Sequence, residues 1–221
     1  MNKIALLDIG EALTTHTTKL FTSYAKQNPA YQTVNQPILI PCNFEKINPY
    51  LPKQYPILKT LIEPYLLEAE KRNCTHLLVP NITMHDVLDQ LFSELTIKLK
   101  LIHPLQCLNF ELPSPATIYL FGTRHTMKPG YISNYLTKLG YRVRYPSASD
   151  IQVIDELRVA TYKLGVNKTN RLQLNHLIEK YQQPVILACS ELSLLNNSHC
   201  KGDLLQLQIN EAVKLSHQQD E

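Results

Sequence analysis

The chain predicts an α/β protein of two similar lobes, each a mainly parallel sheet flanked by helices, with an active-site cleft between the lobes. Strand-like runs alternate with helical patterns along the sequence, which indicates βαβ units. Two segments also repeat one design, an apolar strand that ends in small reactive residues where a helix begins: HLLVPNITMHDVL (76–88) and PVILACSELSLL (184–195). Ligands bind at the carboxyl ends of parallel strands, so two such ends predict a binding cleft.

The first lobe, residues 1–113, opens with the apolar run KIALLD. Continuous runs of Ile, Leu and Val are typical of parallel strands, because helices cover both faces of the sheet. The expected strands of this lobe cover 3–8, 36–41, 75–80 and 98–104. Helical periodicity predicts helices at 12–27, 55–73 and 83–94.

The second lobe, residues 114–200, begins near LPSPA (112–116), where two prolines and a serine interrupt the periodicity. Its expected strands cover 116–122, 141–146 and 184–189, and its expected helices cover 127–139, 149–164 and 169–182. A last helical pattern at 206–217 belongs to the segment 201–221, which is expected to pack back on the first lobe. The length of 221 residues gives each lobe about 100 residues, enough to bury a core.

Composition excludes several classes of partner. The chain is 44% hydrophobic and 19% charged, and its net charge of +3 is spread along the sequence, so no nucleic-acid partner is expected. The apolar stretch in MNKIALLDIG is too short for a signal peptide. No window approaches the ~20 apolar residues of a membrane span, so we expect a cytoplasmic protein without a membrane partner.

The number and spacing of the cysteines and glycines argue against disulfides, a metal site and nucleotide-binding motifs. The five cysteines lie far apart without CxxC spacing, which favours reduced thiols over a disulfide framework. No metal site is expected, because the adjacent His199 and Cys200 would point apart. The six glycines do not cluster, so neither a dinucleotide fingerprint nor a P-loop is predicted and no cofactor is expected. Gly122 either lets a ligand approach the backbone or simply permits the turn into the next helix.

Cys189 is the candidate reactive group. It ends an apolar run, and Ser190 and Glu191 follow as the expected N-cap and first-turn residues of a short helix. Unsatisfied N–H groups at a helix N-terminus favour a thiolate, so we expect a pKa below the usual ~8.5. The alternative is a small buried hydrophobe at a strand end, which is what most lone cysteines are.

Four motifs in order give the chain a family resemblance. PNITMH (80–85) and ACSE (188–191) resemble the paired motifs of the aspartate/glutamate racemase superfamily, in which Asn-Thr-x-His faces Gly-Cys-Thr-Glu. FGTRHTM (121–127) is similar to the family's Gly-Thr-x-x-Thr-Met turn, and IDELRVATYKLGV (154–166) to its Ile-x-Asp-Glu-Leu helix. With the N-terminal strand and EAV (211–213), the resemblance covers most of the chain.

The resemblance implies a cofactor-independent racemase of aspartate or glutamate, usually a homodimer. Racemisation removes the α-proton from one face of an amino acid and returns a proton to the other, so two groups must flank the substrate. No pyridoxal or metal absorbs the charge, so hydrogen-bond donors must hold the carboxylate and stabilise the intermediate. By resemblance the catalytic residues are Cys189, Thr83 and His85. The substrate-binding residues implied by it are Asn81, Thr123, Thr126, Ser190 and Glu191.

The sequence departs from the family at the first base. Pro80 stands where the family has cysteine or threonine, and a displaced Thr83 is a poor base unless strongly activated. Asp8-Ile9-Gly10 replaces a Gly-Gly-Met loop, and Asp203-Leu204-Leu205 replaces a more polar Asp-Thr-Thr. Asp8 either binds an ammonium group or caps a turn.

Further alternatives stay open. His85 either relays a proton at physiological pH or packs in its helix. Arg124 could bind a carboxylate, although an exposed arginine on a turn is common. Three functions are compatible with the sequence: a racemase, a single-thiol relative such as a decarboxylase or isomerase, and a catalytically silent homologue that binds a small amino acid or dicarboxylate.

Overall fold

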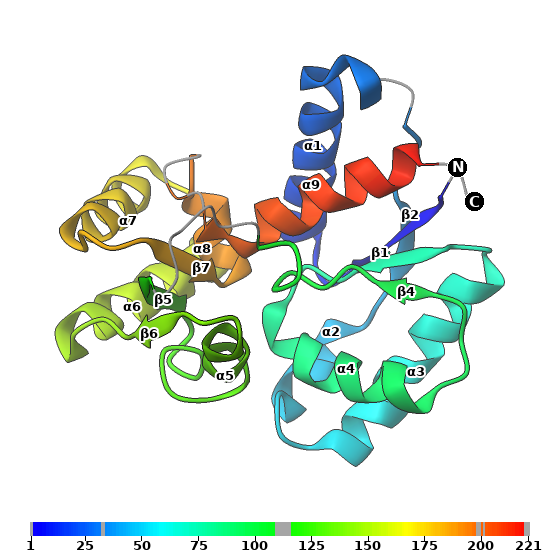
Figure 1. Cartoon of the computed structure of the whole chain (residues 1–221), viewed down its shortest axis with the longest axis horizontal. Helices are drawn as coiled ribbons and strands as arrows, with labels where there is room; N and C mark the ends of the chain where they lie inside the picture. Colours follow the sequence, from blue (N-terminus) through cyan, green and yellow to red (C-terminus); the bar gives the residue numbers. More distant parts are fainter. Residues whose placement is uncertain (1, 32–33, 109–115, 198–199, 201, 219–221) are drawn as a thin grey trace. The chain divides into compact units, whose positions relative to one another are not determined.

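Two four-stranded parallel sheets, each flanked by helices, make up the described part of the computed structural model, residues 2–31, 34–108, 116–197, 200 and 202–218 (Figure 1). The strand orders are β2-β1-β3-β4 and β6-β5-β7-β8. In both sheets the first strand of the unit lies between the second and the third. The expected α/β class with two similar lobes is confirmed.

The first sheet contains β1 (Ile4–Asp8), β2 (Ile38–Pro41), β3 (His76–Leu78) and β4 (Lys100–Leu101). Strand β1 is central and almost entirely buried, which explains its unbroken apolar sequence. The helices of this unit are α1 (Glu11–Gln27), α2 (Phe44–Ile47), α3 (Tyr55–Lys71) and α4 (His85–Glu94). One core lies between the sheet residues Ala5, Leu7 and Leu77 and the apolar sides of α3 and α4.

The second sheet contains β5 (Thr117–Gly122), β6 (Arg142–Arg144), β7 (Val185–Ala188) and β8 (Gly202–Asp203). Its helices are α5 (Tyr131–Lys138), α6 (Ala148–Leu164), α7 (Lys168–Lys180) and α8 (Ser190–Leu195). Strand β7 is buried along its whole length, and its core includes Leu187, Cys189 and Leu192.

The chain divides into two compact units, Met1–His103 with Gln208–Glu221, and Pro104–Leu207. Helix α9 (Leu204–His217) therefore starts in the second unit and continues into the first. The sequence places the change of lobe after residue 113, and residues 109–115, with most of LPSPA, lie outside the described residues. His199, one of the two residues considered for a metal, also lies outside them.

Several element bounds differ from those expected. The strand predicted at 98–104 is paired only over Lys100–Leu101, and the helix predicted from 127 begins at Tyr131. The predicted helix near Thr83 begins with a 3₁₀ turn, Ile82–Met84, before α4. At Cys189 the expected cap assignment is wrong by one residue, because Cys189 itself is the N-cap of α8.

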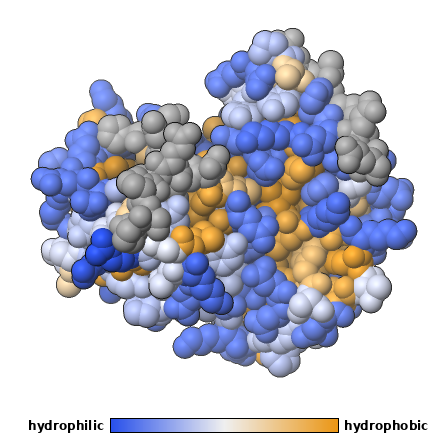
Figure 2. Space-filling view, in the orientation of Figure 1, coloured by the Kyte–Doolittle hydropathy of each residue, from blue (hydrophilic) through white to orange (hydrophobic). Residues whose placement is uncertain are grey.

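No helix among the described residues is both long enough and apolar enough to cross a membrane. The surface in Figure 2 is mostly hydrophilic, with apolar residues gathered over the region that holds β4 and α4. This matches the partly buried Leu95, Ile97 and Leu101, which border the core of the first unit.

Candidate functional site

In the first unit, the segment Asn81–His85, here the NITMH turn, follows β3 at the carboxyl edge of the sheet. Asn81 is the N-cap of the 3₁₀ turn, and its side-chain oxygen accepts a hydrogen bond from the Met84 N–H at 3.2 Å. The amide N–H groups of Asn81 have no partner among the described residues. The Thr83 hydroxyl has none there either. Both side chains are partly exposed, so this turn can offer donors to a carboxylate.

His85 is fully buried and hydrogen-bonded at both ring nitrogens. Nδ1 lies 2.9 Å from the Asn81 carbonyl oxygen, and Nε2 lies 3.3 Å from Nε2 of Gln208 on α9. The ring also makes an edge contact with His103 at a centroid distance of 5.1 Å. Burial and then His103 lower the pKa of His85 from 6.5 to about 3. The hypothesis that His85 relays a proton at physiological pH is therefore contradicted, because the ring stays neutral there.

Asp8 ends β1, and Cys42 directly follows the neighbouring strand β2. Asp8 Oδ1 accepts hydrogen bonds from the Gly10 N–H at 3.3 Å and from the Thr14 hydroxyl at 2.6 Å, so Asp8 acts as the turn cap. Burial raises the pKa of the Cys42 thiol to about 11. Cys42 is thus a protonated thiol at neutral pH.

In the second unit, β5 and β7 are paired, with Gly122 opposite Ala188. Thr123 and Cys189 each follow directly, so they leave adjacent strands that lie about 4.8 Å apart. The sequence-predicted residues of this unit, Thr123, Thr126, Cys189, Ser190 and Glu191, are thereby brought to one edge of the sheet.

The space over Gly122 is occupied by protein. A Cβ at this position would lie 2.2 Å from the Thr126 hydroxyl oxygen and 2.9 Å from the Ala188 carbonyl oxygen. The Thr126 hydroxyl donates to the Thr123 carbonyl at 2.9 Å, and the Thr126 N–H donates to the Thr123 hydroxyl at 3.1 Å. Gly122 therefore admits a self-bonded threonine turn, and this accounts for the glycine without a ligand.

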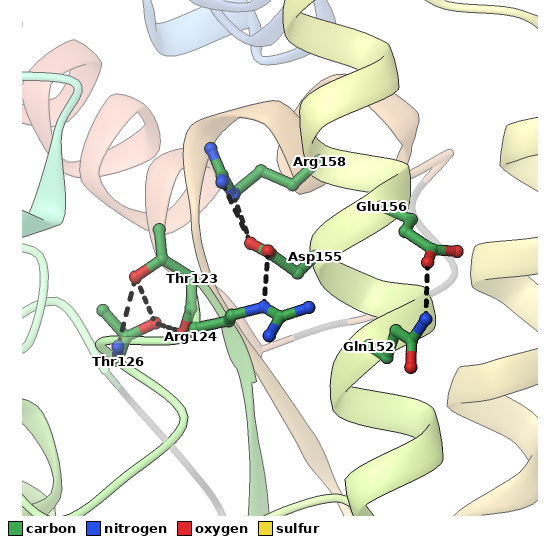
Figure 3. A network of polar contacts seen from close by, with 7 residues as sticks. All are labelled: Thr123, Arg124, Thr126, Gln152, Asp155, Glu156 and Arg158. Carbon is green, nitrogen blue, oxygen red and sulfur yellow. Dashed lines mark hydrogen bonds and ion pairs between the residues drawn. The ribbon is translucent and has the colours of Figure 1, made fainter.

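Arg124 extends from this turn to α6 (Figure 3). Its Nε lies 2.8 Å from Asp155 Oδ2, and Arg158 binds the other oxygen of Asp155 at 2.9 Å. Two motifs far apart in sequence, GTRHTM and IDELR, are thus joined by an ion pair. Gln152 and Glu156 bond to each other at 2.9 Å along α6 (Figure 3).

Cys189, Ser190 and Glu191 form a small cluster, here the thiol cluster, at the start of α8. The Cys189 thiol donates to Glu191 Oε2 at 2.9 Å, and the Ser190 hydroxyl donates to the same oxygen at 3.2 Å. Cys189 is buried as part of the apolar core of the second unit, while Ser190 and Glu191 are partly exposed.

The expectation of a Cys189 thiolate is wrong. Burial first, and then the charge and hydrogen bond of Glu191, hold the pKa of this thiol well above its usual value. The backbone N–H groups of Leu192 and Glu191 act in the expected direction and lower it, but they are outweighed. Helix α8 has six residues, so its N-terminus offers limited compensation for the loss of water. The resting group is a thiol that can donate a proton.

The carboxylate of Asp203, which the family pattern associates with the ligand, is hydrogen-bonded to groups of the protein itself. Its carboxylate accepts hydrogen bonds at 2.8 Å from both the Ser193 hydroxyl and the Asn196 amide. It also accepts from the N–H groups of Leu205 and Gln206, which makes it the cap of α9. Burial raises its pKa. Asp203 therefore organises this part of the fold.

Two other features fall outside the motifs. Among the described residues, no group of three or more His, Cys, Asp or Glu is arranged to hold a metal ion. A groove of about 580 Å³ runs along the threonine-rich side of α1 and is lined also by Lys19, Lys26 and Leu39. None of the predicted site residues lines it.

Sequence reasoning missed three residues that shape the site: Asp155, His103 and Gln208. Asp155 lies in the IDELR motif, so an ion pair between its carboxylate and Arg124 of the GTRHTM motif could have been predicted. Gln208 is 123 positions from His85, and no local pattern connects the two.

Comparisons with known proteins find similarity in structure and none in sequence families. No family model and no curated protein matches the chain by sequence. A proposed Asp/Glu racemase from Yersinia pestis superimposes with a TM-score of 0.78 at 21% identity, covering 99% of this chain and 100% of that one. An aspartate racemase homologue from Pyrococcus horikoshii gives 0.74 at 19%, with coverage of 99% and 100%. The aspartate racemase of Picrophilus torridus gives 0.61 at 15%, with coverage of 89% and 85%. The chain has the fold of these proteins over nearly its whole length.

Proposed function

We propose that this protein transfers a proton at the α-carbon of an acidic amino acid, as a cofactor-independent racemase does, with Cys189 as one acid/base. The observation that carries the proposal is the hydrogen bond from the Cys189 thiol to Glu191 at 2.9 Å, at the carboxyl end of β7. This contact places a protonated thiol beside a carboxylate, which can accept the thiol proton when Cys189 is to act as a base. The shared fold of the racemases supports the same assignment.

The NITMH turn is proposed to bind the substrate carboxylate. The Asn81 amide and the Thr83 hydroxyl both have donors left over, and neutral donors of this kind stabilise negative charge without a cofactor. Thr123, Thr126 and Ser190 are weaker candidates as donors, because each hydroxyl already bonds within its own turn. Glu191 acts on Cys189 in this proposal and does not bind the carboxylate.

A second candidate is proton delivery from one face only. The NITMH turn contains no thiol, His85 is neutral and buried, and Thr83 supplies the one hydroxyl among the predicted catalytic residues of this turn. A threonine hydroxyl is a weak acid and a weak base. An enzyme with Cys189 alone would protonate an enolate-like intermediate, as a decarboxylase or isomerase requires.

Incubation with the enantiomers of aspartate and glutamate in D₂O separates these functions. A racemase gives the opposite enantiomer carrying deuterium, and a one-sided catalyst gives α-deuteration with retained configuration. Chiral chromatography with mass spectrometry measures both. No deuterium from any of the four amino acids would contradict proton transfer on these substrates, and a thermal shift with the same ligands would then reveal a binding protein. Ligand at 100 times its Kd adds about 2.7 kcal/mol to stability.

A further inference from the structure

The buried contacts of Gln208 form a chain that ends at the NITMH turn. Gln208 is 1% exposed, and its Nε2 lies 2.6 Å from the Ile102 carbonyl oxygen and 3.3 Å from His85 Nε2. His85 Nδ1 in turn lies 2.9 Å from the Asn81 carbonyl oxygen. All four residues belong to the first unit.

Donor and acceptor chemistry allows one assignment of hydrogens along this chain. A backbone carbonyl only accepts, so the group facing Ile102 must be the Gln208 NH₂, and this fixes the orientation of the amide. The second hydrogen of that NH₂ then points to His85 Nε2, which must accept. Nδ1 faces another carbonyl and must donate. His85 is thereby held as the neutral tautomer with its proton on Nδ1.

The same bonds determine the shape of the turn. Asn81 contributes its carbonyl to His85 and its side-chain oxygen to the Met84 N–H, so both ends of the 3₁₀ turn are tied. A ring that rotated, or that carried its proton on Nε2, would leave the Asn81 carbonyl with only the Met84 N–H, which lies 3.2 Å from it. The turn would then lose one of the bonds that set the direction of the Asn81 amide and the Thr83 hydroxyl, and the Met84 N–H would hold it alone.

We propose that Gln208 is a positioning residue for the active site: it selects the Nδ1–H tautomer of His85 and so holds the Asn81–Met84 turn in the shape that binds substrate. The catalytic consequence rests on the proposed function, while the tautomer and the turn do not. Gln208 touches no reacting atom. It acts through His85, which has the same indirect role.

The first test needs no substrate. In wild-type protein labelled with ¹⁵N-histidine, NMR at pH 7 is expected to show His85 as the Nδ1–H tautomer. Gln208→Glu replaces the donor with an acceptor, so the Nε2 of His85 gains a proton. Gln208→Met removes the donor and keeps the volume, and the Met84 amide is expected to exchange with solvent at least 10-fold faster. Gln206→Leu, on the same helix with no side-chain hydrogen bond among the described residues, is the control.

The second test concerns catalysis. If the wild-type enzyme deuterates its substrate, Gln208→Met is expected to lower kcat/KM at least 10-fold, and Gln206→Leu is expected to leave it unchanged. A wild type without activity would contradict the proposed function and leave the tautomer result standing. His85 carrying its proton on Nε2 in the wild type, or Met84 exchange equal in Gln208→Met and Gln206→Leu, would overturn the positioning role.

Discussion

At the residue scale, burial and then the neighbouring Glu191 set the protonation state from which the Cys189 thiol begins. A carboxylate beside a buried sulfur penalises the thiolate twice, through its charge and through its preference for an S–H donor. The thiol is consequently a proton donor at rest. It becomes a base only after it has delivered its proton, which gives the two directions of the reaction unequal starting points.

Glu191→Gln is expected to lower the pKa of Cys189, because the substitution removes the negative charge and keeps the size of the side chain. Titration of the ¹³Cβ shift of labelled cysteines measures the change. Cys200 is the internal control, since its thiol bonds to the Val185 carbonyl and its pKa of about 12 owes nothing to Glu191. A Cys189 pKa that stays the same or rises in the variant would show that Glu191 is not what suppresses the thiolate.

The candidate residues could be found from the sequence, but their states could not. Cys189, Asn81 and Thr83 lie where the strand-end pattern places them. The pKa of Cys189 has the opposite shift to the one expected, since a helix N-terminus can be recognised in sequence and the burial that outweighs it cannot. His85 likewise depends on Gln208 and His103, which only tertiary packing brings to it.

At the element scale, expectation and structure differ mainly in where the strands and helices begin and end. Strand β8 pairs over two residues, too few for an apolar pattern to reveal it in the sequence, and β4 is paired over only two residues of the strand expected at 98–104. Helix α5 begins at Tyr131, after the N-cap Gly130, whose N–H donates to the Ser133 hydroxyl at 3.0 Å. Central strands β1 and β7 were predictable, since complete burial requires continuous apolar sequence.

Asp203→Asn is expected to destabilise the protein by about 1–3 kcal/mol, because an NH₂ group would face donors from Ser193, Asn196 and the start of α9. Urea unfolding measures the loss. Glu211→Gln is the control on the same helix. Glu211 is partly exposed and lies 3.5 Å from Lys214, so its loss is expected to change the free energy of unfolding by less than about 0.5 kcal/mol. Equal effects of the two substitutions would exclude Asp203 as the organising cap.

At the scale of the whole molecule, the repeated strand order places equivalent strand ends in both units. The NITMH turn follows β3 and the thiol cluster follows β7, the third strand of each sheet. This equivalence was visible as the repeated strand-to-helix segment. The strand-to-helix pattern predicts a binding cleft, and only the resemblance of the short motifs suggests the racemase reaction. No family model or curated protein matches the chain by sequence.

Stability is expected to fall as the pH falls below about 6.5. The unfolded chain binds a proton at His85 near pH 6.5, whereas the folded chain does so only near pH 3. Between these values the folded state is penalised by up to ~1.4 kcal/mol per pH unit from this one group. His103, whose pKa burial also lowers, adds in the same direction. Asp203, whose pKa is raised, opposes the trend above its ordinary 3.8.

Urea unfolding of the wild type and of His85→Phe at pH 7.5, 6 and 5 measures this dependence. The variant is expected to be less stable at pH 7.5, because it loses two hydrogen bonds, and to lose less stability on acidification. Parallel curves for the two proteins would mean that His85 does not carry the pH dependence.

The most direct test of the account is the rate of α-deuteration in D₂O by wild type, Cys189→Ser and Cys200→Ser. Both serine variants remove a buried thiol from the second unit, and only one of those thiols contacts Glu191. The account predicts that Cys189→Ser lowers the rate by a factor of about 10² or more, while Cys200→Ser keeps it. A Cys189→Ser enzyme as fast as the wild type would contradict the assignment of proton transfer to this sulfur.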